Sequence, residues 1–484
     1  MNAVRELAER RPFAVALLLA LVLLLVPYRA LLGPGVPSGR DLVPYFYPLK
    51  VHLVEAIRAG EMPWVDRFRW GGLPLLSWPG VASFDPANAL FVLLPTAVAA
   101  KAWMLLRVLT GAAGFAVFLR VTGLPPLSSA LGALAWGASG ITASSASFLG
   151  LSSAHAMLPW FAAALVHARS SRSPRAIGLL GLATGLLLAA SVPEPLVAAS
   201  LLALVLLAGR GDGGAFRERA GTAALWGAGA VVGALLAAPV LGAYVVTGQE
   251  SVRGVAGALE PGFSEQGALP AARLAELLAD GVVADWTTVS RTPGIPVYPY
   301  FPSLTPGRVV WTLALVGLFA GRGARLRGVS LVALGVLLAL GPATPLHGLL
   351  GRLVAPAAVL RYPEKHAVLF AFGIVWLAAL GAAVFERTLG ERHARTGFAL
   401  LAALVLLDRG AMTDRLLAMS PASLLERRPQ VLSALPAAGP GESPPRVLAL
   451  TGYRTPPGAV LEDPRAGGPT MAEWALPWSP VSWV

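Results

Sequence analysis

Long apolar stretches alternate with short polar joints along most of this 484-residue chain. An apolar run of about 20 residues is long enough to cross roughly 30 Å of hydrocarbon as a helix. The runs predict eleven transmembrane helices, near residues 12–32, 97–119, 127–149, 153–168, 176–191, 195–209, 222–246, 309–321, 328–341, 366–385 and 397–412. Because basic residues precede the first run and no small-residue cleavage site follows it, it is typical of an uncleaved signal anchor.

Arginines in the joints predict the orientation of these helices. With the N-terminus in the cytoplasm, every joint predicted on the cytoplasmic side contains arginine, as the positive-inside bias requires. Those arginines are Arg120, Arg169, Arg172, Arg175, Arg210, Arg217, Arg219, Arg322, Arg325, Arg327, Arg387, Arg392 and Arg395. An odd number of helices places the C-terminus outside.

The remaining hydrophilic segments are then external. They are three loops at about 34–95, 247–308 and 342–365, and a Pro- and Gly-rich tail at 413–484 that follows a transmembrane domain of residues 1–412. Within the second loop, the periodicity of residues 270–280 predicts a short amphipathic helix lying at the membrane interface.

The composition supports a membrane protein and excludes other classes. Hydrophobic residues make up 56% of the chain and charged residues 13%, against about 25% charged in a typical soluble domain. The net charge of +12 resides in the joints, not in a basic stripe with interleaved aromatic residues, so nucleic acid is not an expected partner. The absence of cysteine excludes disulfides and thiolate metal sites.

Asp41 is the first candidate for chemistry, because it directly follows the external end of the first predicted span. A carboxylate at a membrane boundary is partly desolvated and is accessible to lipid and aqueous substrates alike. It can take a proton from an acceptor hydroxyl or hold a divalent cation such as Mg or Mn beside a phosphate. The alternative is an ordinary solvated loop carboxylate.

A second candidate is the segment from Arg361 to His366, which opens a late helix. Pro363 fits the first turn of a helix, and the free N–H groups and dipole at that end favour an anion. Arg361 and Lys365 add cationic donors that could hold a phosphate. The alternative is that these cations meet anionic lipid headgroups, at about 1 kcal/mol each.

His155 and Glu194 are ionisable residues near apolar spans. Such groups cost about 2.5–3.5 kcal/mol at membrane depth and tend to be paired or functional. Both are also close enough to a helix end to reach water, and a hydrogen-bonded structural histidine is the alternative for His155.

The order of features in the first loop resembles that of the YfhO-like bacterial membrane proteins. Asp41 is followed by an aromatic and proline segment with Tyr45, an amphipathic stretch, and a turn with Asp66. Residues 151–160, 191–195 and 360–366 are similar to further segments of that family. The turn departs from the family pattern Pro-x-Trp-Asn, because residues 63–66 lack its spacing and its asparagine, and this leaves the role of Asp66 open.

That family resembles the GT-C glycosyltransferases, which use polyprenyl-phosphate sugars. The resemblance implies an all-α polytopic, GT-C-like membrane protein with large external loops. It further implies transfer of a sugar from a polyprenyl-phosphate carrier to an envelope glycan, lipid or protein, outside the cytoplasmic membrane of a bacterium.

The implied roles can be assigned residue by residue. They are Asp41 as the catalytic base or metal ligand, Arg361, Lys365 and His366 as donor-phosphate ligands, and Tyr45, Asp66, His155 and Glu194 as lining of the substrate cavity. A transporter or flippase of lipid-linked glycans is one alternative, although its usual internal repeats are not evident. A non-catalytic assembly subunit is another. Convergence of the charged candidates on one external cavity would favour the enzyme.

Overall fold

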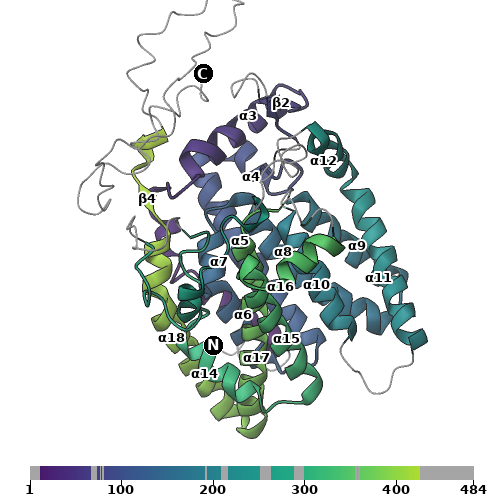
Figure 1. Ribbon diagram of the computed structural model, residues 1–484. Helices are drawn as coiled ribbons and strands as arrows, with labels where there is room; N and C mark the ends of the chain where they lie inside the picture. The colour runs from purple at the N-terminus through teal and green to yellow at the C-terminus, as the bar shows by residue number, and fades with distance from the viewer. Residues whose placement is uncertain are drawn as a thin grey trace, which may run out of the picture.

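The computed structural model describes residues 11–66, 73–76, 78, 81–190, 193–208, 216–250, 263–287, 299–354, 357 and 360–425. Nearly all regular structure in these residues is helical (Figure 1), which confirms the predicted all-α class. The α-helices are α2 (Pro12–Leu23), α3 (Tyr47–Arg58), α4 (Asn88–Leu93), α5 (Thr96–Val121), α6 (Pro126–Ala138), α7 (Gly140–Ser145), α8 (Leu149–Ser171), α9 (Pro174–Ala189), α10 (Glu194–Ala208), α11 (Phe216–Leu236), α12 (Ala238–Glu250), α14 (Arg308–Gly317), α15 (Arg322–Ala339), α16 (Pro345–Leu353), α17 (Ala367–Thr388) and α18 (Glu391–Leu416).

Short elements connect these helices. They are the 3-10 helices η1 (Arg29–Leu32), η3 (Phe263–Glu265), η4 (Ala271–Leu277), η5 (Gly341–Ala343), η7 (Pro363–His366) and η8 (Ala422–Leu425), the π-helix η2 (Leu42–Phe46), and the strands β1 (Val36–Pro37), β2 (Val65–Asp66), β3 (Leu73–Pro74) and β4 (Met419–Ser420).

The helices have the length and composition of membrane spans. Five are long and apolar enough to cross a bilayer, namely Thr96–Val121, Leu149–Ser171, Glu218–Leu236, Pro363–Thr388 and Arg392–Leu416. Five shorter apolar helices accompany them among the described residues. A multi-pass membrane protein is therefore confirmed at this level, and the count of eleven spans stays a prediction.

The predicted span at 127–149 is not one continuous helix, because the chain there forms α6 and α7 with a break at Ser139. Ser139 caps α7 by accepting a hydrogen bond from the Thr142 N–H through its side chain. The Gly140 N–H donates across to the Thr305 carbonyl at 2.9 Å. A segment of the predicted second external loop is therefore bonded directly into the helical bundle.

α17 forms the centre of the bundle, and α6, α14 and α15 pack against it. Its apolar residues are buried nearly throughout its length, whereas most of the membrane-length window of α18 is not buried. Gly317 of α14 and Gly381 of α17 allow their backbones to meet, since a Cβ at either glycine would lie 2.0 Å from a carbonyl oxygen of the other helix. Small residues at such crossings are how membrane helices approach closely.

The predicted first external loop folds over one end of the bundle. η2, α3, the antiparallel pair β2–β3 and α4 lie there, at the upper end in Figure 1. β1 pairs with β4 in antiparallel register, Val36 opposite Ser420. This pairing fixes the start of the loop to the chain that follows α18.

Candidate functional site

Four segments distant in sequence meet around Tyr300. Its ring stacks on that of Phe148, with centroids 4.7 Å apart and planes 12° apart. The Tyr362 ring lies 5.0 Å away, and the Lys365 Nζ lies 4.7 Å from the Tyr300 centroid. Arg40 donates a hydrogen bond to the Tyr300 carbonyl. The aromatic ring of Tyr300 is therefore the centre of a cluster built from both loops and two helix ends.

Asp41 stands at the edge of this cluster, at the start of η2. Its side chain is exposed, and its charge acts on Tyr300 together with that of Glu194. The protein packed around this exposed carboxylate still displaces part of its water and raises the pKa of Asp41, while the guanidinium of Arg40 opposes this shift. A carboxylate with a raised pKa is a better proton acceptor than an ordinary aspartate.

Two arginines present their guanidinium groups beside these aromatic rings. That of Arg40 lies 4.5 Å from the Phe148 centroid and that of Arg361 lies 5.2 Å from the Tyr362 centroid. Both side chains are partly buried. Such stacking holds a guanidinium in place without neutralising its charge.

Glu194 and Lys365 form a buried ion pair behind Tyr300. The Lys365 Nζ donates to the Glu194 Oε1 at 2.7 Å. Glu194 is the first residue of α10 and Lys365 lies in η7, which leads into α17. The Glu194 Oε2 is buried and accepts no hydrogen bond from the residues that the structure describes. One carboxylate oxygen of the pair therefore has no hydrogen-bond donor among the described residues.

Two histidines complete this group. Both ring nitrogens of His155 and the Nδ1 of His366 are buried with no hydrogen-bond partner in the described part of the chain. The charge of Lys365 acts on both rings. A cavity of about 10 Å³ next to His155, lined also by Arg107 and Ser152, has room for about one water molecule. The alternative role of His155 as a hydrogen-bonded structural histidine is therefore not supported, because no described residue forms a hydrogen bond with its ring.

Backbone strain marks both flanks of the cluster. Arg40 and Tyr362 have left-handed φ angles of 55° and 62°. For residues other than glycine, this conformation costs on the order of 1–3 kcal/mol and is concentrated at functional sites. The Tyr362 N–H donates to the Gln266 carbonyl at 2.7 Å, which helps to hold the strained turn.

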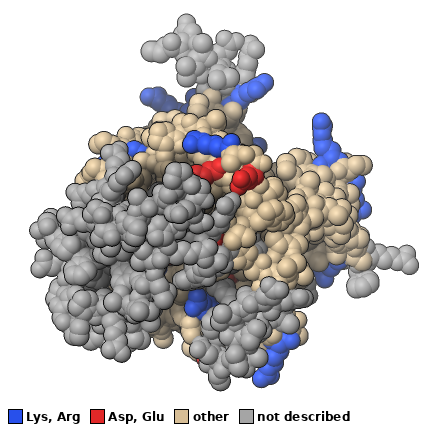
Figure 2. Space-filling view, turned by 90° about the horizontal axis from the view of Figure 1, so that it is seen from above, with Lys and Arg blue, Asp and Glu red and all other residues tan. Residues whose placement is uncertain are grey.

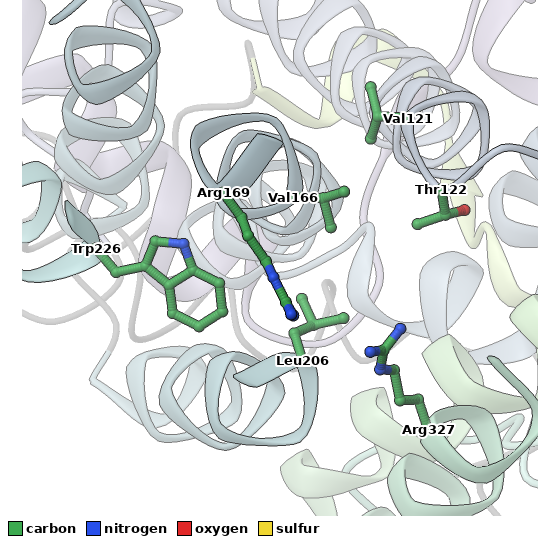
Figure 3. Close-up of a pocket in the computed structure, with 7 residues that line it drawn as sticks. All are labelled: Val121, Thr122, Val166, Arg169, Leu206, Trp226 and Arg327. Atoms are coloured by element: carbon green, nitrogen blue, oxygen red, sulfur yellow. The ribbon is translucent and has the colours of Figure 1, made fainter. Parts of the chain in front are cut away.

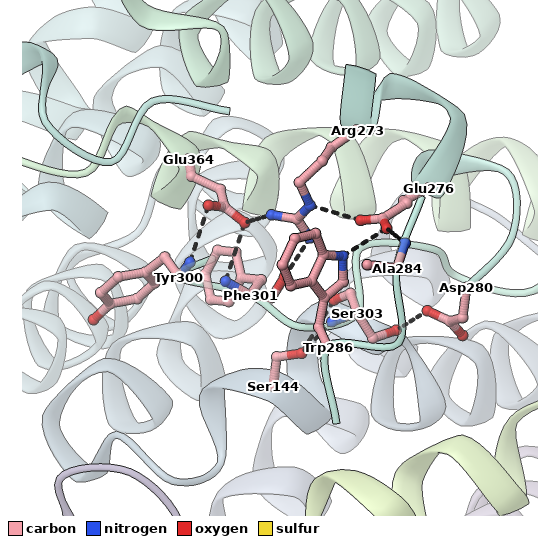
Figure 4. Close-up of polar contacts among 10 residues, drawn as sticks. All are labelled: Ser144, Arg273, Glu276, Asp280, Ala284, Trp286, Tyr300, Phe301, Ser303 and Glu364. Atoms are coloured by element: carbon pink, nitrogen blue, oxygen red, sulfur yellow. Dashed lines mark hydrogen bonds and ion pairs between the residues drawn. The ribbon is translucent and has the colours of Figure 1, made fainter. Parts of the chain in front are cut away.

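A saturated polar network supports the cluster from one side (Figure 4). Arg273 donates to Glu276 at 2.6 Å, to Glu364 at 2.8 Å and to the Phe301 carbonyl at 2.8 Å. Glu364 accepts from the backbone N–H groups of Tyr300 and Phe301, both at 3.0 Å. This network fixes the backbone that carries Tyr300.

The prediction of an interfacial helix at residues 270–280 is therefore wrong. The segment forms η4, in which Arg273 is 0% exposed and Glu276 is 2% exposed. The Trp286 Nε1 donates to Glu276 at 2.6 Å. The periodicity predicts that the polar face of this segment lies in water. Instead, that face forms hydrogen bonds with η7 and with the second loop.

The structure places Tyr45 and Asp66 within the folded first loop. Tyr45 packs edge-on against Phe46, with ring centroids 4.9 Å apart, and against the small apolar cluster of Leu49, Leu53, Leu75 and Val81. Asp66 is 1% exposed, with its Oδ1 3.9 Å from the His52 Nε2. A role in the substrate cavity stays a prediction for both.

The donor set does not fit a metal centre built by the protein. Among the described residues, no three His, Asp or Glu side chains are grouped closely enough to hold a metal ion. The charged neighbour of Asp41 is the cation Arg40. We derive no step through a Mg or Mn ion.

Arg40 and Tyr300 were not identified from the sequence as site residues. Arg40 directly precedes Asp41, and Tyr300 lies in a run of aromatic residues and prolines at 298–302 that ends the second loop. Either feature could have drawn attention to them. In the view from above (Figure 2), acidic side chains lie directly beside basic ones on a face whose other described residues are mostly uncharged.

No protein-family model and no curated protein match this sequence. The fold is similar to two solved structures of the arabinofuranosyltransferase AftD from Mycobacteria, which are two classes of one mutant. Their TM-scores are 0.48 and 0.44, with 16% and 18% sequence identity. In both cases the match covers 84% of this chain and 28% of the other. The YfhO-like resemblance stays a prediction.

Proposed function

We propose that this chain is a membrane glycosyltransferase of the GT-C type, which moves a sugar from a polyprenyl-phosphate carrier to an acceptor of the bacterial cell envelope. The reaction takes place at the external face of the cytoplasmic membrane. The observation that carries this proposal is that Lys365 lies over the Tyr300 ring and pairs with Glu194, while Arg40, the residue before Asp41, donates to the Tyr300 carbonyl. Asp41, Glu194 and Lys365 come from separate parts of the chain, and the sequence predicts a role for each of them.

Asp41 is the general base in this proposal. The oxygen of an acceptor hydroxyl forms a bond to the anomeric carbon of the sugar, and its proton passes to the Asp41 carboxylate. The bond between that carbon and the phosphate oxygen of the carrier breaks, and its electron pair leaves with the phosphate. Attack on the face opposite the leaving group inverts the configuration at that carbon.

Arginines stabilise the departing phosphate. Arg40 and Arg361 offer planar guanidinium groups that match phosphate oxygens, held beside Phe148 and Tyr362. Lys365 is already paired with Glu194, so it orients that carboxylate and adds positive potential. The open Glu194 Oε2 and the ring nitrogens of His155 are suited to accept from or donate to sugar hydroxyls.

The geometry also bears on the alternative of an assembly subunit. A chain that kept only the fold would have no reason to hold strained residues and unsatisfied buried polar atoms at one place. Each such atom costs about 1–3 kcal/mol. The presence of Arg40 and Tyr362 in strained conformations beside buried atoms of Glu194 and His155 without a described partner favours an enzyme.

The test is transfer of labelled sugar in membranes supplied with polyprenyl-phosphate sugars. Asp41→Asn should lower transfer by a factor of about 10²–10⁴, because general base catalysis contributes that much. Glu61→Gln, at an exposed carboxylate of the same loop, is the matched control and should leave transfer unchanged. Equal transfer by Asp41→Asn and the native protein, at equal expression, would refute the proposed role of Asp41.

A further inference from the structure

A cavity of about 250 Å³ lies far from Tyr300, at the other end of the same helices. α8 carries His155 near its start and Arg169 in its last turn, about 21 Å apart at 1.5 Å per residue. α10 carries Glu194 as its first residue and Leu206 near its end. The distribution of arginines predicts that this end of the bundle faces the cytoplasm.

Two cations and an apolar wall line this cavity. The guanidinium groups of Arg169 and Arg327 point into it from different helices (Figure 3). They are near enough for the charge of one to act on the other. Arg169 forms no ion pair with any residue in the described part of the chain. Two like charges facing one space favour an anion between them.

The remaining walls indicate what kind of anion fits. They are formed by the side chains of Val121, Thr122, Val166, Leu206 and Trp226. Val121, which lines the cavity, is 39% exposed. The cavity therefore lies beside apolar surface that faces lipid, and its volume equals about eight water molecules. That is enough for a phosphate group and the first atoms of a lipid attached to it.

We propose that this cavity binds the phosphate headgroup of a membrane lipid between Arg169 and Arg327, with the first part of the lipid chain against Val166 and Leu206. Each guanidinium donates a fork of hydrogen bonds to phosphate oxygens, while the apolar wall accepts the methylene groups. This site is separate from the proposed sugar-transfer site and does not depend on it. The competing explanation is that both arginines are ordinary cations at helix ends.

The experiment measures lipid binding to the purified full-length chain in a neutral detergent by native mass spectrometry. Dioleoyl phosphatidic acid, dioleoyl phosphatidylcholine and inorganic phosphate are titrated separately. The native protein should bind phosphatidic acid at least tenfold more tightly than either of the others. Equal binding of inorganic phosphate would overturn the assignment to a lipid in favour of a free anion.

Paired variants separate a built site from general charge. The double variant Arg169→Gln, Arg327→Gln should bind phosphatidic acid at least tenfold more weakly. The matched control Arg175→Gln, Arg322→Gln removes the same charge at exposed positions of the same end, and it should bind within twofold of the native protein. Equal weakening in both pairs would overturn the proposal.

A third variant keeps both charges and fills the space. Leu206→Phe should weaken binding of phosphatidic acid several-fold, with a melting temperature close to that of the native protein. Unchanged lipid binding in this variant, with its fold intact, would show that the cavity is not where the lipid binds.

Discussion

Glu364 and Lys365 are neighbours in η7, yet they belong to two polar groups of different character. Glu364 faces Arg273, and each of its oxygens accepts hydrogen bonds from guanidinium or backbone N–H groups. Lys365 faces Glu194, whose second oxygen has no partner among the described residues. The first group is saturated and the second is open.

The two groups therefore have different roles: the first stabilises the fold, and the second is suited to bind a ligand. A buried polar network that satisfies all its members makes its region rigid. An open group has donors and acceptors left for a ligand, and it depends on rigid surroundings to hold them in place. The Arg273 network supplies that support, because it bonds the backbone of Tyr300 and Phe301.

Breaking the saturated group should have the largest effect on stability. Arg273→Met leaves Glu276 and Glu364 buried without their cation. Removal of one partner from such a pair costs about 3–5 kcal/mol. Thermal melting of the purified protein in detergent should show a large fall in melting temperature. A melting temperature equal to that of the native protein would contradict the structural role of the network.

A milder change in the same group should cost less. Trp286→Phe removes the hydrogen bond to Glu276 and leaves an aromatic ring beside Arg273. A hydrogen bond to a charged group contributes about 1.5 kcal/mol, so the melting temperature should fall by less than in Arg273→Met. Sugar transfer below the melting temperature should stay near the native rate, which separates this group from the chemistry.

The open group should show the reverse pattern. Glu194→Gln keeps an oxygen that accepts from Lys365 but removes the negative charge of the second oxygen. Because charge-assisted hydrogen bonds are about twice as strong as neutral ones, sugar transfer should fall about tenfold, or about 1.4 kcal/mol. The melting temperature should fall less than in Arg273→Met, because the amide oxygen still accepts from Lys365. A loss of stability without a loss of transfer would place Glu194 with the structural group.

The smallest effect is a shift in pH dependence. Desolvation raises the pKa of Asp41, so the rate of transfer should rise with pH along a limb that lies above the ordinary range of an aspartate. Since the native state then binds more protons than the unfolded state in that window, stability should fall as pH rises through it.

A variant of Arg40 provides a second test of this pH dependence. Because its charge opposes the rise in the pKa of Asp41, Arg40→Gln should move the acidic limb of the pH–rate profile to higher pH. Glu61→Gln should leave the limb unchanged. A limb that moves to lower pH in Arg40→Gln would contradict the placement of Arg40 beside the base.

Part of the candidate site could be found from the sequence because ionisable residues stand out in apolar surroundings. Glu194 is such a residue, whereas Asp41 is a candidate because it follows the first span and Lys365 because it opens a late helix; the structure places Lys365 over the Tyr300 ring and in a pair with Glu194. The family resemblance adds Asp66 to these candidates, and the structure places it beside His52 in the folded first loop. The position of an ionisable residue in the sequence indicates that its charge needs a partner, but it does not show which residue that partner is.

Two properties follow from the sequence alone, namely that the apolar runs lie in lipid and that the fold is all-α. Apolar runs must lie in lipid, and a chain in lipid must satisfy its backbone groups within each helix. The tertiary structure alone shows that Glu364 belongs to the Arg273 network and that Lys365 pairs with Glu194. It also decided that Arg40 and Tyr300 join them, from positions 260 residues apart. The physical reason is that periodicity fixes which face of an element is polar, whereas packing between distant segments fixes what that face meets.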